Sequence, residues 1–195
     1  AVAQAHAAGQ TAFGENYIQE AVEKIQALQH SPLEWHCIGP IQSNKTRPVA
    51  EHFDWGHSLD RLKIAQRLSE QRPAHLAPLQ VCIQVNVDGG ATKSGVAASE
   101  ALELAQAVAL LPRMHLRGIM CIPEPAPDFV AACAVFSGAR ALFDDMRLAG
   151  LAIDTLSMGM SADLEAAVAS GSTMVRVGSA IFGQRSLTSS ATQSV

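Results

Sequence analysis

Short apolar runs alternate with amphipathic runs along most of the chain. The apolar runs predict seven strands, at residues 11–15, 35–38, 54–57, 79–86, 116–121, 155–158 and 174–178. Between the strands, apolar residues recur every three or four positions, as in Ile18, Val22 and Ile25, and this spacing predicts helices. Because strands that alternate with helices form parallel βαβ units, the sequence predicts an α/β fold.

Signals for helix ends agree with this pattern. The longest helix is predicted over residues 128–149, because this run follows Pro127 and stops at Gly150. Ser161 is predicted to cap the next helix, which should end near Gly171. Each of these helices lies between two predicted strands, as a βαβ unit requires.

The number of strands favours a barrel. Seven parallel strands are one short of a closed (β/α)8 barrel and more than the five or six of most open doubly wound sheets. Residues 1–8 look helical and Gly9 can end them, so the missing strand should precede residue 1. We therefore expect residues 1–185 to form strands 2 to 8 of a TIM-type (β/α)8 barrel whose first strand is missing from this chain. The Ser- and Thr-rich tail, residues 186–195, is expected to be disordered.

Composition narrows the range of ligands. The chain has 195 residues, of which 48% are apolar and 16% are charged, and its formal net charge is -4. This length suits one domain, and the charge argues against a nucleic-acid partner. No apolar run approaches a membrane span, and the N-terminus lacks the features of a signal peptide, so we expect a cytoplasmic protein without membrane contact. The expected ligand is a small molecule.

The cysteines and histidines show no metal-binding pattern. Cys37, Cys82, Cys121 and Cys133 are widely spaced, and the seven histidines form neither HxxxH nor HxH. We expect the cysteines to be reduced and mostly buried. A lone histidine such as His36 is expected to be a structural residue.

The last two strand-to-helix loops are candidates for an anion site. In (β/α) barrels, phosphate is often held by the loops after the last two strands, which here span residues 157–161 and 177–180. Gly178 allows the backbone to approach a ligand, while Ser161 and Ser179 supply hydroxyl groups. Glycine and serine are also ordinary loop residues, so these loops alone leave the question open.

Arg176 strengthens the case for a site. It lies among apolar residues of the last predicted strand, where a guanidinium needs a partner. One interpretation is a structural ion pair with an acid such as Glu15, and the other is a donor to a phosphate or ring nitrogen at the barrel mouth. Both stay open at this point. Lys45 and Lys93 follow earlier strands and could equally be solvated.

Four segments together resemble a known family. They read FGENYIQEA (13–21), WHCIGPIQSNK (35–45), VNVDGGATKSG (85–95) and LSMGMSADLEAAVASGSTMVRVGSAIFG (156–183). In this order they resemble the pyridoxal phosphate homeostasis proteins, the YggS/PROSC group. The resemblance runs nearly end to end, apart from the tail.

The resemblance implies a fold, a cofactor and a set of contacts. The fold would be a single barrel similar to the N-terminal domain of alanine racemase. The function would be binding of pyridoxal 5'-phosphate (PLP) in intracellular vitamin B6 homeostasis, without established catalytic turnover. By motif, the phosphate would lie against Ser161, Gly178 and Ser179, and Arg176 would face the pyridine nitrogen. The remaining pocket-lining residues implied are Met158 and Asn44.

The resemblance also has a gap. The family's cofactor lysine, which holds PLP as an aldimine, lies in a Ser-Lys motif upstream of the FGEN strand, and no residue of this chain matches it. We therefore assign no Schiff-base lysine, although Lys93 is a candidate second pocket amine. The expected partners are the small-molecule cofactor and PLP-dependent apoenzymes, and the expected state is a monomer.

Three alternatives remain open on the sequence. A PLP-dependent racemase or decarboxylase would need a second, β-rich domain and a second catalytic group, and the only tyrosine is Tyr17. A sugar-phosphate barrel enzyme would keep the phosphate site without vitamin B6 chemistry. A truncated fragment would have lost cofactor binding altogether.

Overall fold

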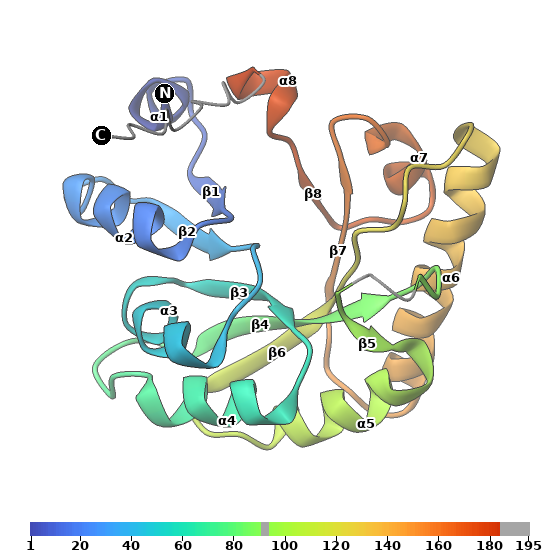
Figure 1. Cartoon of the computed structure of the whole chain (residues 1–195), viewed down its shortest axis with the longest axis horizontal. Helices are drawn as coiled ribbons and strands as arrows, with labels where there is room; N and C mark the ends of the chain where they lie inside the picture. Colours follow the sequence, from blue (N-terminus) through green and yellow to red (C-terminus); the bar gives the residue numbers. More distant parts are fainter. Residues whose placement is uncertain (91–93, 184–195) are drawn as a thin grey trace, which may run out of the picture.

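The chain forms a nearly closed parallel barrel surrounded by helices in a computed structural model that describes residues 1–90 and 94–183 (Figure 1). The strands are β1 (Ala12–Glu15), β2 (Glu34–Cys37), β3 (Trp55–Leu59), β4 (Leu79–Asn86), β5 (Val96–Ala97), β6 (Met114–Met120), β7 (Thr155–Met160) and β8 (Met174–Arg176). Seven of them follow the order β1-β2-β3-β4-β6-β7-β8, and the short β5 pairs with β4 off this path. All the pairs are parallel, so the carboxyl ends of the strands meet at one end of the barrel.

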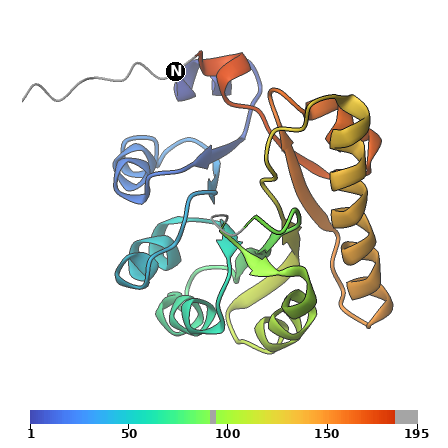
Figure 2. The ribbon, with the colours of Figure 1, turned by 45° about the vertical axis from the view of Figure 1, so that its right-hand side comes forward.

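Helices cover the outside of the curved row of strands (Figure 2). They are α1 (Val2–Ala7), α2 (Ile18–Ala27), the 3-10 helix η1 (Ser43–Lys45), α3 (Thr46–His52), α4 (Leu62–Gln71), α5 (Ala98–Ala109), α6 (Phe129–Leu148), α7 (Leu164–Ala169) and α8 (Ser179–Phe182). In the part of the chain that the structure describes, no helix is both long and apolar enough to cross a membrane.

The structure confirms all seven predicted strands, each with boundaries within a few residues. It adds β5, which was missed because two residues carry no legible alternation. The long helix is also confirmed: α6 is capped by Asp128, whose carboxylate accepts a hydrogen bond from Ala131 N at 2.8 Å. The prediction that Ser161 caps the next helix is wrong, because α7 has Asp163 at its N-cap.

Two apolar layers hold the barrel together. The large layer lies between strands and helices, where Leu156 of β7 and Phe136 of α6 are both buried. A small cluster inside the barrel contains Trp55, Cys82 and Met120. Side chains along a strand alternate between these two layers, so each strand position contributes to one of them.

The sheet path ends at β1 on one side and at β8 on the other (Figure 1). This arrangement agrees with the expected TIM-type barrel. The prediction that a further strand precedes residue 1 stays a prediction. The proposed domain limit at residue 185 and the tail, 186–195, lie outside the described residues.

Candidate cofactor site

The two predicted anion loops lie side by side because β7 and β8 are paired neighbours. Met160 and Arg176 are register partners at the carboxyl ends of these strands. Beyond the strands, Ala180 N donates a hydrogen bond to Ser161 Oγ at 3.3 Å, which joins the first loop to the start of α8. Gly178 is the N-cap of α8, and a Cβ added there would meet no atom within 4 Å. Ser161 therefore lies close to the loop that contains Gly178.

A second observation explains why the first loop is glycine-containing. Gly159 has φ +94°, and a Cβ at this position would lie 2.5 Å from the Cβ of Ala167 in α7. Met160, the last residue of β7, donates its N–H to the Asp163 carboxylate at 2.6 Å across the turn that contains Ser161. Close packing of α7 against the strand end thus positions Ser161 at the barrel mouth.

Arg176 is the last residue of β8 and bonds to two neutral oxygens. Its Nη1 donates to Ser157 Oγ at 2.7 Å, and its Nη2 donates to the carbonyl oxygen of Cys121 at 2.9 Å. Burial lowers the pKa of Arg176 from its usual value. The alternative ion pair is not formed, since Glu15 pairs with Lys24 Nζ at 2.6 Å. A buried cation held by neutral acceptors is suited to a further anionic or acceptor partner.

Met158, Asn44 and Lys93 have different positions. The Met158 side chain is fully buried in the outer apolar layer, on the opposite face of β7 from its neighbour Ser157. Asn44 is exposed in η1, after β2. Lys93 lies outside the described residues. The structure therefore brings together Ser161, Gly178 and Arg176, whereas Met158 belongs to the core.

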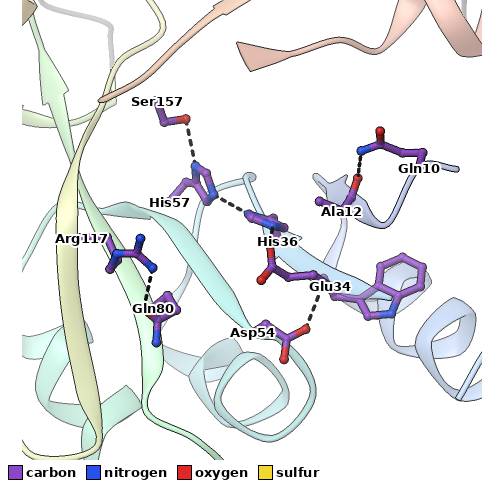
Figure 3. A network of polar contacts seen from close by, with 10 residues as sticks. Gln10, Ala12, Glu34, His36, Asp54, His57, Gln80, Arg117 and Ser157 are labelled. Atoms are coloured by element: carbon purple, nitrogen blue, oxygen red, sulfur yellow. Dashed lines mark hydrogen bonds and ion pairs between the residues drawn. The ribbon is translucent and has the colours of Figure 1, made fainter. Parts of the chain in front are cut away.

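A row of hydrogen-bonded polar residues that the sequence did not reveal, here called the polar chain, crosses the barrel interior (Figure 3). It begins with Glu34 Oε1, which lies 2.8 Å from His36 Nε2, and His36 Nδ1 lies 2.9 Å from His57 Nε2. His57 Nδ1 in turn lies 3.0 Å from Ser157 Oγ, the same oxygen that accepts from Arg176. Polar residues inside otherwise apolar barrel strands were a usable signal in the sequence. Such residues must point either at the helices or into the barrel interior.

His36 and His57, the two histidines of the polar chain, are buried and uncharged near neutral pH. Burial lowers the pKa of His57 well below its usual value, and nearby His36 and Arg176 add to this effect. Burial also lowers the pKa of His36, although the hydrogen bond that His36 donates to the Glu34 carboxylate partly opposes it. The interior therefore holds neutral imidazoles rather than a cluster of cations.

An aromatic and ionic group lies beside the polar chain. The His36 ring stacks on Trp55 with 5.1 Å between ring centroids, and Arg117 Cζ lies 4.8 Å from the Trp55 ring centroid. Arg117 also pairs with the Asp154 carboxylate at 2.7 Å.

Neither metal chemistry nor thiol chemistry is supported by the described residues. Within residues 1–90 and 94–183, no group of three His, Cys, Asp or Glu side chains could hold a metal ion. The four cysteines are free thiols. Burial raises the pKa of Cys37, Cys82 and Cys121 to about 12, so these three are poor nucleophiles at neutral pH.

Comparison with known proteins gives the family. The family described as "Alanine racemase, N-terminal domain" matches residues 1–186. A pyridoxal phosphate homeostasis protein from Pseudomonas aeruginosa is 60% identical over 185 residues, which cover 95% of this chain and 79% of that protein. The protein of the same name from Escherichia coli is 55% identical over 188 residues, covering 95% and 80%.

Solved structures agree with the sequence matches. PipY of Synechococcus elongatus with PLP bound is 36% identical, with a TM-score of 0.85, and the alignment covers 93% of this chain and 86% of PipY. Alanine racemase of Clostridium difficile, at 15% identity and a TM-score of 0.76, shows the shared fold alone, over 93% of this chain and 47% of that one. The chain belongs to the pyridoxal phosphate homeostasis protein family.

Proposed function

We propose that this chain binds PLP at the mouth of the barrel and takes part in intracellular PLP homeostasis without catalytic turnover. The phosphate would lie against Ser161, Gly178 and Ser179, and the pyridine nitrogen would face Arg176. The observation that carries this proposal is the buried guanidinium of Arg176 beside two paired, donor-rich loops. The PLP-bound structure of PipY, a relative over most of the chain, supports it.

The donor set fits the two ends of PLP. A phosphate ester accepts hydrogen bonds from hydroxyl and backbone N–H groups, and the loop between β8 and α8 offers such groups close to Ser161. When bound, PLP would supply an aldehyde and an electron-withdrawing ring. We assign no lysine to the aldehyde.

Arg176 suits a role without turnover or a racemase-like role. A guanidinium donates hydrogen bonds and stays protonated at all relevant pH values. It can therefore stabilise an unprotonated ring nitrogen but gives it no proton. Because a protonated ring nitrogen makes PLP a stronger electron sink, this arrangement would leave bound PLP a weaker electron sink.

The binding test uses pyridoxamine 5'-phosphate, which has no aldehyde and so reports the phosphate and ring contacts alone. In calorimetric titrations of the full chain, we expect it to bind at least about tenfold more tightly than pyridoxamine, because the phosphate adds charge-assisted hydrogen bonds. Ser161→Ala should weaken the phosphorylated ligand and leave pyridoxamine unchanged. Arg176→Ala should weaken both ligands.

Two controls sharpen this test. Ser137→Ala, on the exposed surface of α6, should leave both affinities unchanged. Ribose 5-phosphate should not compete with pyridoxamine 5'-phosphate for the site. A sugar-phosphate enzyme, in contrast, would bind it. Equal affinity for pyridoxamine and its phosphate would contradict the phosphate site.

The remaining parts of the proposal concern turnover, assembly and location. We infer a cytoplasmic monomer, which agrees with four free cysteines, and PLP-dependent apoenzymes as partners. Chiral chromatography after incubation with PLP and L-alanine should show no D-alanine above a protein-free control. Light scattering should give a mass near 20.6 kDa, and twice that mass would contradict the monomer.

A further inference from the structure

The polar chain inside the barrel connects its two ends. Glu34 is the first residue of β2, at the amino end of the barrel, and its side chain is 50% exposed. His36, His57 and Ser157 follow in the interior, and Arg176 lies at the carboxyl end of β8. Four consecutive contacts of 2.7 to 3.0 Å therefore lead from solvent at one end to the candidate site at the other.

The residues at the two ends of the polar chain, one a pure donor and the other a pure acceptor, fix the direction of every hydrogen bond between them. Arg176 can only donate, so Ser157 Oγ accepts a hydrogen bond from it. The Ser157 hydroxyl is then free to donate a hydrogen bond to His57 Nδ1. Neutral His57 then carries its proton on Nε2 and donates to His36 Nδ1. His36 likewise carries its proton on Nε2 and donates to the Glu34 carboxylate, which can only accept.

The opposite direction is incompatible with neutral imidazoles. If His57 donated from Nδ1 to Ser157, its Nε2 would have to accept a proton from His36 Nδ1. A neutral His36 would then present a bare Nε2 to the Glu34 carboxylate at 2.8 Å, which places two acceptors in contact. Only a protonated His36 would remove this conflict, and that would place a cation in a buried position.

We propose that Glu34 is a positioning residue for Arg176 and acts on it through His36, His57 and Ser157. This inference rests on the proposed function, because it concerns the group that would face the pyridine nitrogen. Glu34 fixes the tautomer of both histidines and thereby the direction in which the Ser157 hydroxyl points. The hydroxyl oxygen then always presents a lone pair to Arg176 Nη1.

The consequence for the guanidinium is a fixed plane. Arg176 is anchored through Nη1 to Ser157 and through Nη2 to the Cys121 carbonyl, and two anchors on different nitrogens fix the orientation of a planar group. If the Ser157 hydroxyl turned its proton toward Arg176, the first anchor would be lost. The guanidinium would then be free to rotate away from the orientation that the mouth of the barrel requires.

The first test needs no ligand. In the full chain labelled with ¹⁵N, long-range proton–nitrogen spectra should show both His36 and His57 with a protonated Nε2 and an unprotonated Nδ1. Glu34→Ala should convert both histidines to mixed tautomers, although His57 does not touch Glu34. The same variant should increase exchange of the Arg176 side-chain N–H signals. Glu34→Gln keeps a carbonyl acceptor for His36 and should restore the pattern.

Two further variants serve as control and second probe. Glu51→Ala removes a surface carboxylate of similar exposure that pairs with Arg47, and it should change none of these signals. Ser157→Ala removes the link between His57 and Arg176, so the signals of these two residues should change while His36 stays fixed by Glu34. An Nδ1–H tautomer at His57 in the unsubstituted chain would overturn the proposal. So would a Glu34→Ala effect confined to His36.

A second readout links the chain of contacts to the site. Glu34→Ala should weaken pyridoxamine 5'-phosphate by about threefold to tenfold, the usual effect of one displaced hydrogen bond, whereas Glu34→Gln should not. Unchanged affinity in Glu34→Ala would contradict the positioning role. If the unsubstituted chain bound no ligand, the proposed function would fail, and the tautomer measurements would still decide the direction of the hydrogen bonds.

Discussion

At the scale of single residues, Gly159 determines how closely α7 can approach the end of β7. Its φ is +94°, and an added Cβ would lie 2.5 Å from the Cβ of Ala167. A side chain here would both strain the backbone and push α7 outward. Since α7 follows the turn that contains Ser161, the same shift would disturb the proposed phosphate contact.

We therefore predict that Gly159→Ala lowers the free energy of unfolding by about 1–3 kcal/mol, from strain and overpacking together. Urea denaturation would measure it. The matched control is Gly138→Ala in α6, where a Cβ meets nothing within 4 Å and φ is not positive. This substitution should stabilise the chain by about 0.4–1 kcal/mol. Equal effects of the two substitutions would refute this account of Gly159.

Local sequence motifs were sufficient to predict part of the candidate site. Ser161, Gly178 and Arg176 were predicted from loop position and from a charge inside an apolar strand, and the structure brings them close together. Met158 shows the limit of motifs, because strand alternation directs its side chain into the outer layer. The contact between His57 and Ser157 joins positions 100 residues apart, so no local pattern could reveal it.

At the scale of elements, the N-cap of α6 is a well-defined contribution to stability. Asp128 accepts a hydrogen bond from Ala131 N at 2.8 Å and lies at the positive end of the longest helix in the described chain. Asp128→Ala should therefore lower the free energy of unfolding by about 1 kcal/mol, as measured by urea denaturation.

Asp145 provides the control for this prediction. It is exposed in the last turn of the same helix, where a negative charge opposes the helix dipole. Asp145→Ala should leave stability unchanged or raise it slightly. A loss equal to that of Asp128→Ala would mean that the cap has no special role.

Elements were predictable where they are long and periodic. β4 was predicted with its observed limits, and α6 within one residue at each end, because both carry strong apolar patterns over many positions. The start of α7 was wrong because Ser161 and Asp163 are both good capping residues, and the choice between them depends on the tight turn at Gly159. Local capping preference did not distinguish these two residues, and the tertiary packing of α7 determined which of them begins the helix.

At the scale of the whole molecule, the chain of contacts across the barrel should make stability depend on pH. Burial lowers the pKa of His36 and His57 below their usual value of 6.5. Below that pH the unfolded chain binds protons that the folded chain rejects. The free energy of unfolding should therefore be constant above about pH 7 and fall as the pH decreases below 6.5, by at most about 1.4 kcal/mol per pH unit for each histidine.

Urea denaturation at pH 7.5, 6.5 and 5.5 would measure this dependence. His57→Gln removes the group with the more strongly lowered pKa and should reduce the loss between pH 6.5 and 5.5. Asp154 does not interfere in this range, because the hydrogen bond from Arg117 lowers its pKa from 3.8 and moves its titration further toward acid. Identical stability at pH 7.5 and 5.5 would show that the two imidazoles are not neutral when folded.

The distance along the chain between His57 and Ser157 also bears on synthesis at the ribosome. At roughly 5–20 residues per second, His57 is made on the order of 5–20 seconds before its hydroxyl partner, 100 residues later. During that interval the nascent strands β2 and β3 contain both imidazoles, but Ser157, the hydrogen-bond partner of His57, has not yet been made. The polar interior can thus be completed only in a late step, when β7 and β8 emerge and join the strands already made.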